Sequence, residues 1–180
     1  MVSQSSAQNA LPRRIATGLE TSPALDRPAR ALRVLAKPLD SLPRIRGVLA
    51  GIPFGHAVHP VLTDIPIGLW TSSTVLDLVG HESSRAASDR LLGLGVLAAA
   101  PAALTGLVDW SSSRQRVQRV GAAHALLNGV ALTLYSTSWL LRRRGRRRLA
   151  VVVSLAAGGA VGSSGYLGGH MAFVQRAPQA

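Results

Sequence analysis

The fold is decided by the stretch GHAVHPVLTDIPIGLW, residues 55–70. It places His56 and His59 immediately before a long apolar run, and Asp64 just inside that run. Pro66 follows and predicts a local break in the helix, which would free backbone carbonyls near Asp64. Ionisable groups in an apolar segment are costly, so they usually face a cavity or one another rather than lipid. The stretch therefore predicts the mouth of a membrane helix with a candidate functional site beside it.

The composition is that of a membrane protein. Hydrophobic residues make up 47% of the 180-residue chain and charged residues 16%, which is too apolar and too poor in charge for a typical soluble domain. The formal net charge is +12, and arginines in the first fifty residues and at 142–148 supply most of it. Basic residues beside apolar spans determine topology and attract anionic lipids. Nucleic-acid binding is not expected, because no aromatic residues are interleaved with the basic ones.

The chain has no cysteine. Disulfides, thiolate catalysis and iron–sulfur ligation by cysteine are therefore excluded, and any metal must be bound by His, Asp or Glu. The sequence also has no phosphate-binding glycine loop, no nucleophile elbow and no zinc-protease pair of histidines. A stand-alone enzyme is not expected.

Four apolar segments come close to the length that crosses about 30 Å of hydrocarbon. They cover about 60–79, 91–108, 120–141 and 149–173. The connections are short, so consecutive helices should be antiparallel neighbours. Residues 55–175 are thus expected to form an all-α, up-down, four-helix membrane bundle. The arginine run at 142–148 favours a cytoplasmic position for its loop, with both termini outside.

The region before the bundle divides into two parts. Residues 1–22 show no apolar periodicity and are expected to be a disordered tail. Residues 23–54 form a basic linker, in which 23–39 is amphipathic and suited to the membrane surface. Pro28 and Pro38 are expected to break that segment into short pieces.

Glycines mark the predicted contacts between helices. In the second span they make a thin helix, which Pro101 is expected to kink; these glycines are Gly93, Gly95 and Gly106. In the fourth span they follow the small-xxx-small pattern, which lets a neighbouring helix, or that of a second copy, approach closely; these are Gly158, Gly162, Gly165 and Gly169. Trp70, Trp110 and Trp139 are interpreted as packing or interfacial residues.

Alternating helix direction brings several ionisable residues to one end of the bundle. These are His56, His59, Asp64, Asp109, His124 and His170. Asn128 lies one turn from His124, and Tyr166 lies one turn from His170, so each could orient its imidazole. Asp77 and His81 fall at the other end, where Asp77 is expected to anchor the helix or to pair with an arginine.

This set of residue types suits several chemistries. Neutral imidazoles bind haem iron in pairs from facing helices of a bundle, and with carboxylates they bind zinc, iron, copper or manganese. They could also relay protons or meet a quinone, because histidine titrates near neutrality. The candidate cofactor ligands are His59, His124, His170 and His56, and a metal ion would use His59, His124, His170, Asp64 and Asp109.

Five dispersed motifs resemble one family of bacterial membrane proteins, known as domain of unknown function 2231. They lie at 55–70, 76–77, 106–110, 123–128 and 165–170, within a resemblance that covers about 30–172. The resemblance implies a four-helix, multi-pass domain of the bacterial inner membrane. Some family members are joined to Rieske-type iron–sulfur domains, which implies redox chemistry nearby. This chain has no cysteine for a Rieske centre, so any redox partner would be a separate protein.

Three functions follow as hypotheses. The first is an electron-transfer module that holds haem b, a metal ion or a quinone near one membrane face. The second is a structural or partner-binding membrane protein without a cofactor, for which the glycine face makes a homodimer conceivable. The third is a small proton-coupled transporter, which is less expected because four short spans leave little room for alternating access.

Overall fold

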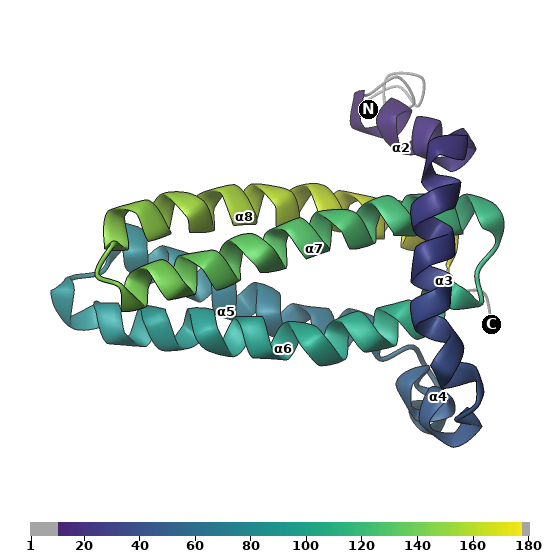
Figure 1. Cartoon of the computed structure of the whole chain (residues 1–180), viewed down its shortest axis with the longest axis horizontal. Coiled ribbons are helices and arrows are strands. Elements are labelled where there is room, and N and C mark those ends of the chain that lie inside the picture. The colour runs from purple at the N-terminus through teal and green to yellow at the C-terminus, as the bar shows by residue number, and fades with distance from the viewer. Residues whose placement is uncertain (1–10, 178–180) are drawn as a thin grey trace, which may run out of the picture.

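The computed structural model describes residues 11–177, and every regular element in that range is helical. Four long antiparallel helices lie side by side in an up-down arrangement (Figure 1). A shorter helix, α3, crosses one end of them at a steep angle and gives the molecule the outline of a T. The long helices are α5 (His59–Val79), α6 (Arg85–Ser111), α7 (Gln115–Arg143) and α8 (Arg147–Gly169), and α8 continues into a π-helical turn, η4 (His170–Val174).

Each long helix covers one of the four predicted apolar segments. α6 and α7 are longer than predicted, because the polar flanks at 85–90 and 115–119 are rich in residues that tolerate a helix, such as Ala, Arg and Gln. The predicted break at Pro66 is wrong, since α5 is assigned as one continuous helix. Pro101 likewise lies inside a continuous α6.

Two of the four long helices are long and apolar enough to cross a membrane. They are Glu82–Ser111, which is α6 with the 3-10 turn η3 (Glu82–Ser84) before it, and Arg147–Val174, which is α8 with η4. The other two, α5 and α7, are not apolar enough over a comparable length. Length and composition therefore support two of the four spans expected from the sequence.

The bundle consists of two hairpins. α5 packs mainly on α6 and α7 mainly on α8, whereas the contacts between the hairpins are fewer. One contact between hairpins is the stack of Trp70 on Tyr135, whose ring centroids are 4.2 Å apart with an angle of 17° between the planes. Both side chains belong to the buried core, together with Leu92 and Ala157.

Aromatic rings lie directly against glycines of neighbouring helices. A Cβ added at Gly95 would come within 2.4 Å of the Trp70 indole nitrogen, and one added at Gly93 within 2.9 Å of that of Trp139. Trp110 covers Gly121 in the same way. The predicted packing role of Gly93, Gly95 and the three tryptophans is confirmed, and Gly121 is a further glycine of this kind.

The glycines of α8 differ. An added Cβ would meet nothing within 4 Å at Gly159, Gly162 or Gly165, and these residues are exposed. Within the described part of the chain, this small-residue face therefore has no helix packed on it, apart from a contact of Gly158 with Tyr135.

Within residues 11–58, three helices precede the bundle: α2 (Leu11–Thr21), α3 (Asp26–Asp40) and α4 (Pro43–Leu49), with 3-10 turns at Pro23–Leu25 and Ile52–Phe54. Residues 11–21, which the sequence predicts as part of a disordered tail over 1–22, form the helix α2, and Ala16 packs in a small core with Val120 and Leu167. Residues 1–10 lie outside the described range.

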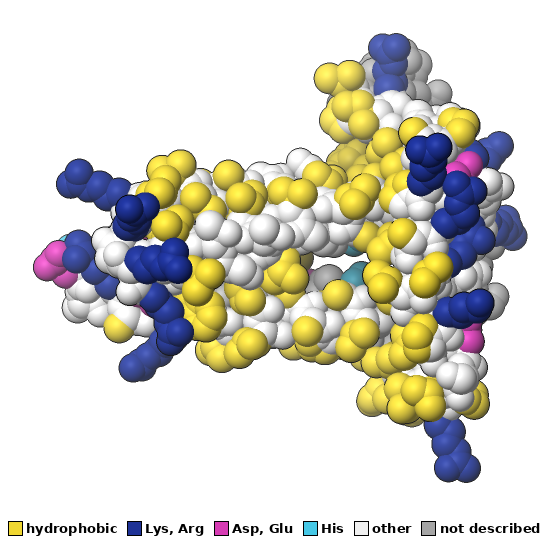
Figure 2. Space-filling model, viewed as in Figure 1, with side chains coloured by type: hydrophobic (Ala, Val, Ile, Leu, Met, Phe, Trp, Pro, Cys, Tyr) yellow, Lys and Arg dark blue, Asp and Glu magenta, His cyan; other side chains and the backbone are white. Residues whose placement is uncertain are grey.

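We call α2, α3 and α4 together the crossbar. Pro28 and Pro38 do not divide α3, which is one continuous helix. Pro28 lies in the first turn, where its missing N–H would have no partner in the helix, and Pro38 removes one hydrogen bond only near the C-terminal end. Arg119 of α7 binds Asp26 at 2.8 Å and anchors α3 to the bundle. Figure 2 shows hydrophobic side chains on the side of the crossbar that faces along the bundle and basic side chains on the opposite side.

Candidate functional site

His59 opens α5 and lies against α6. Its Nδ1 is 2.9 Å from the carbonyl oxygen of Ala102 and 3.5 Å from the hydroxyl of Thr105. Because a carbonyl oxygen can only accept, Nδ1 carries the proton in this geometry and Nε2 keeps its lone pair. Gly106 leaves room for the ring, since a Cβ there would lie 2.6 Å from its Cε1 atom.

His124 occupies the equivalent position in the other hairpin. Its Nδ1 lies 2.8 Å from the carbonyl oxygen and 2.9 Å from the hydroxyl of Ser164 on α8. Its Nε2 lies 3.0 Å from the amide nitrogen of Asn128, one turn further along α7. The carbonyl again places the proton on Nδ1, so Nε2 accepts a hydrogen bond from the amide.

His59 and His124 belong to different hairpins and lie at the same end of the bundle, the end that the crossbar crosses. Figure 2 shows an opening through the bundle between the hairpins, near the crossbar, with a histidine side chain at its edge. The arrangement thus sets two half-buried imidazoles, each oriented by a backbone carbonyl, on opposite sides of the hairpin interface.

The other predicted site residues do not join this pair. His170 is buried and its Nε2 meets a carboxylate oxygen of Glu20 at 2.7 Å. His56 is exposed, and its Nδ1 contacts the carbonyl of the next residue, Ala57. Tyr166 is exposed, and no contact of its side chain with His170 occurs among the described interactions.

Asp64 and Asp109, the two carboxylates predicted for this end of the bundle, do not form a cluster with the histidines. Asp64 is exposed on α5, and Asp109 is partly buried on α6. Over residues 11–177, no group of three or more His, Asp or Glu side chains is arranged to hold a metal ion.

A family model described as "Predicted membrane protein (DUF2231)" matches residues 55–178, which span the four long helices and both imidazoles. The chain belongs to this family. No curated protein and no solved structure matches it. The DUF2231 match begins after the crossbar, at the glycine that opens the 55–70 stretch.

The opposite end of the DUF2231 bundle contains a buried ion-pair network. Asp77 of α5 and Arg142 of α7 are 0% and 1% exposed, and they bind each other through two hydrogen bonds. Arg147 of α8 binds Asp77 at 2.7 Å, and Asp89 of α6 binds both arginines at 3.0 and 2.8 Å. The predicted pairing of Asp77 with an arginine is confirmed. The network joins all four long helices.

Sequence reasoning missed the inward position of Arg142. It is the first arginine of a run that was interpreted as a loop, yet it still belongs to α7. The sequence feature that could have predicted this position is a group of serines at this end of the bundle. Buried serines pair across helices, Ser73 with Ser88 at 3.0 Å and Ser138 with Ser154 at 2.7 Å, and they line the path of the guanidinium.

Proposed function

We propose that this DUF2231 protein is a multi-pass membrane module that would hold haem b between its two hairpins, with His59 and His124 as the residues that bind its iron. The proposal rests on the observation that both imidazole rings are oriented in the same way. Each donates its Nδ1 proton to a carbonyl on the partner helix of its own hairpin. This is the usual arrangement for imidazoles that bind a metal through the other ring nitrogen, and paired imidazoles from facing helices are a haem-binding arrangement.

The membrane placement of all four helices has its own support. Charged side chains gather at the two ends of the bundle, and the surface between them is free of charge in the view of Figure 2. α5 and α7 have no stretch as apolar as those of α6 and α8, but some of their polar side chains point inward. Ser73 and Ser138 are buried and hydrogen-bonded across helices, which is how polar groups are accommodated within membrane bundles. We infer a four-span protein of the bacterial inner membrane.

The residues around the imidazoles fit a planar macrocycle in two respects. Small residues adjoin both rings, Gly106 beside His59 and Gly168 beside His124, where an added Cβ would lie 3.4 Å from the imidazole. The two ligands come from separate hairpins, whose mutual contacts are the sparser ones in the bundle. One change is needed on binding, because Asn128 would have to release Nε2 of His124.

Bound haem would carry one electron at a time between a donor and an acceptor. The protein would contribute ligation, orientation and a largely apolar surround. Because the chain has no cysteine with which to hold an iron–sulfur cluster, its redox partner would be a separate protein.

The test is an absorption spectrum of protein purified in mild detergent from cells supplied with a haem precursor. We expect a Soret band and sharp bands after dithionite reduction, with about one haem per chain by pyridine haemochromogen assay. His59→Ala and His124→Ala should each lose the haem, since neither remaining imidazole can hold both axial positions. His81→Ala, which changes an exposed histidine near the opposite end, is the matched control and should keep it.

Two results would reject the proposal. One is a colourless protein even after reconstitution with added haemin. The other is a haem content and spectrum that are unchanged in both His59→Ala and His124→Ala. Either result would favour the cofactor-free alternative, in which the imidazoles only connect helices through their hydrogen bonds to the carbonyl oxygens of Ala102 and Ser164.

A further inference from the structure

We propose that a groove between α6 and α7, at the end of the bundle opposite the imidazoles, binds an anionic glycerophospholipid. Arg90 and Arg143 would hold the phosphate, and an acyl chain would lie along Leu94 and Leu97. The inference is independent of the haem proposal, since the groove shares no residue with that site.

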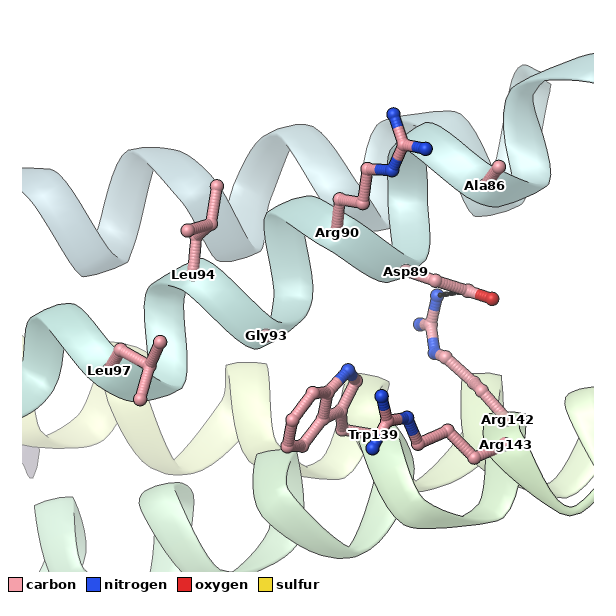
Figure 3. A pocket seen from close by; sticks show the side chains of 9 residues that line it. All are labelled: Ala86, Asp89, Arg90, Gly93, Leu94, Leu97, Trp139, Arg142 and Arg143. Carbon is pink, nitrogen blue, oxygen red and sulfur yellow. Dashed lines mark hydrogen bonds and ion pairs between the residues drawn. The ribbon is translucent and has the colours of Figure 1, made fainter.

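The groove is an open depression of about 570 Å³, a size within the range of small-molecule sites. Figure 3 shows Arg90 and Leu94 standing on the α6 rim, with Trp139 and Arg143 on the α7 wall across Gly93. Glycine at this position lets the indole approach α6 closely, because a Cβ would lie 2.9 Å from its nitrogen. The lining consists of Ala86, Asp89, Arg90, Gly93, Leu94, Leu97, Trp139, Arg142 and Arg143.

Some of the arginines that line the groove are paired with carboxylates, and others are not. Arg142 is neutralised by Asp77 and Asp89, and Asp89 is in turn held by Arg142 and Arg147. Arg90 and Arg143 are exposed and take part in no ion pair with any described residue. The Arg143 guanidinium lies 4.6 Å from the centre of the Trp139 ring, a contact that orients it without neutralising it. Two positive charges therefore remain for an anion.

The groove is also polarised along its length. Arg90, Leu94 and Leu97 lie on one face of α6 at helical spacing, and Leu94 and Leu97 are 53% and 68% exposed. At 1.5 Å per residue they lie about 6 Å and about 10 Å further from the arginine end than Arg90. On the antiparallel α7, Trp139 lies one turn deeper than Arg143 in the same direction.

A site that is basic at its outer end and apolar further in matches an amphiphile better than a free anion. α6 is one of the two helices long and apolar enough to cross a membrane, so its exposed leucines would face acyl chains. Basic pockets between membrane helices are known to bind anionic headgroups. An anionic phospholipid satisfies both halves of the groove.

The experiment uses the full chain in mild detergent and measures tryptophan fluorescence during titration with brominated phospholipids, whose bromine atoms quench nearby indoles. Brominated phosphatidylglycerol is compared with brominated phosphatidylcholine, and the Trp139→Phe variant isolates the signal of the groove. The test variant is Arg90→Gln with Arg143→Gln. The control is Arg144→Gln with Arg148→Gln, which removes the same charge from exposed arginines outside the groove. Circular dichroism checks that each variant is folded.

We expect phosphatidylglycerol to bind about thirtyfold more tightly than phosphatidylcholine, because each arginine near an anionic headgroup contributes about fivefold. The groove variant should lose this preference, and the control should keep most of it. Equal binding of the two lipids by the natural protein would overturn the proposal, as would an equal loss in the control, which would indicate diffuse attraction. Displacement of the lipid by soluble glycerol phosphate at similar concentration would also overturn it, since it would reveal a phosphate site with no need for an acyl chain.

Discussion

Replacing Asp77 by asparagine should destabilise the bundle far more than its small change in shape suggests. Asp77 is 0% exposed and accepts hydrogen bonds from Arg142, Arg147 and Ser88. The asparagine keeps most of the volume but removes the charge that two arginines share. Removing one partner of a buried pair leaves the other charge uncompensated, which typically costs about 3–5 kcal/mol. We expect a value near the lower end, because Asp89 still binds both arginines.

The free energy of unfolding can be measured by titration with sodium dodecyl sulfate in mixed micelles, followed by circular dichroism. Asp40→Asn is the matched control, because Asp40 forms an ion pair with Arg46 at the same kind of distance, 2.7 Å, but is 63% exposed. Surface pairs of this kind contribute less than about 1 kcal/mol. Raising the salt concentration from about 0.1 M to about 1 M should reduce only the surface effect, because the Debye length falls to about 3 Å. Equal losses in the two variants would refute the conclusion that the buried network stabilises the bundle.

Two further predictions concern packing and pH. Gly95→Ala should lower the free energy of unfolding by about 1–3 kcal/mol, because its Cβ would lie 2.4 Å from the Trp70 indole. Gly159→Ala, whose Cβ would meet nothing within 4 Å, should raise it by up to about 1 kcal/mol through helix propensity. Thermal melts that shift in the same direction for both variants would contradict this packing. The Arg119 guanidinium lowers the pKa of Asp26 below its usual 3.8, so the anchor of α3 is intact above that value and is lost as the pH falls through the lowered pKa. Hydrogen exchange of α3, corrected for its intrinsic pH dependence, should rise below about pH 4 in the natural protein, and a rise of the same size in Asp26→Asn would show that another group controls it.

The helices of the bundle could be predicted because their signal is local. An apolar run of about twenty residues between short polar connections predicts one helix, and α5 begins at His59 within one residue of the prediction. Alternating direction then places His59 and His124 at the same end without any knowledge of packing. The chain matches the predicted family over residues 55–178.

The partners of the site residues could not be predicted, because they depend on how helices far apart in the sequence are rotated toward each other. His124 meets Ser164, and His170 meets Glu20, a residue in a segment that was expected to be disordered. Spacing along one helix identified Asn128 as a neighbour of His124 but gave no information on these contacts. Arg142 was assigned to a loop for a similar reason, since only the rotation of α7 turns it inward.

The contacts between aromatic rings and glycines also limit which substitutions the bundle can accept. At each of them a ring occupies the space that a side chain at the glycine would need, so a larger residue at the glycine would force the ring or the helix to move. Substitutions should therefore occur in compensating pairs, a larger residue in place of the glycine together with a smaller one in place of the ring. Three of the four glycines belong to α6, which makes this helix the most constrained in the bundle; the pairs are Trp139 with Gly93, Trp70 with Gly95, His59 with Gly106 and Trp110 with Gly121. An engineer who wishes to widen or narrow the space between the hairpins should alter both members of Trp139–Gly93 or of Trp110–Gly121, the two pairs that join α6 to α7.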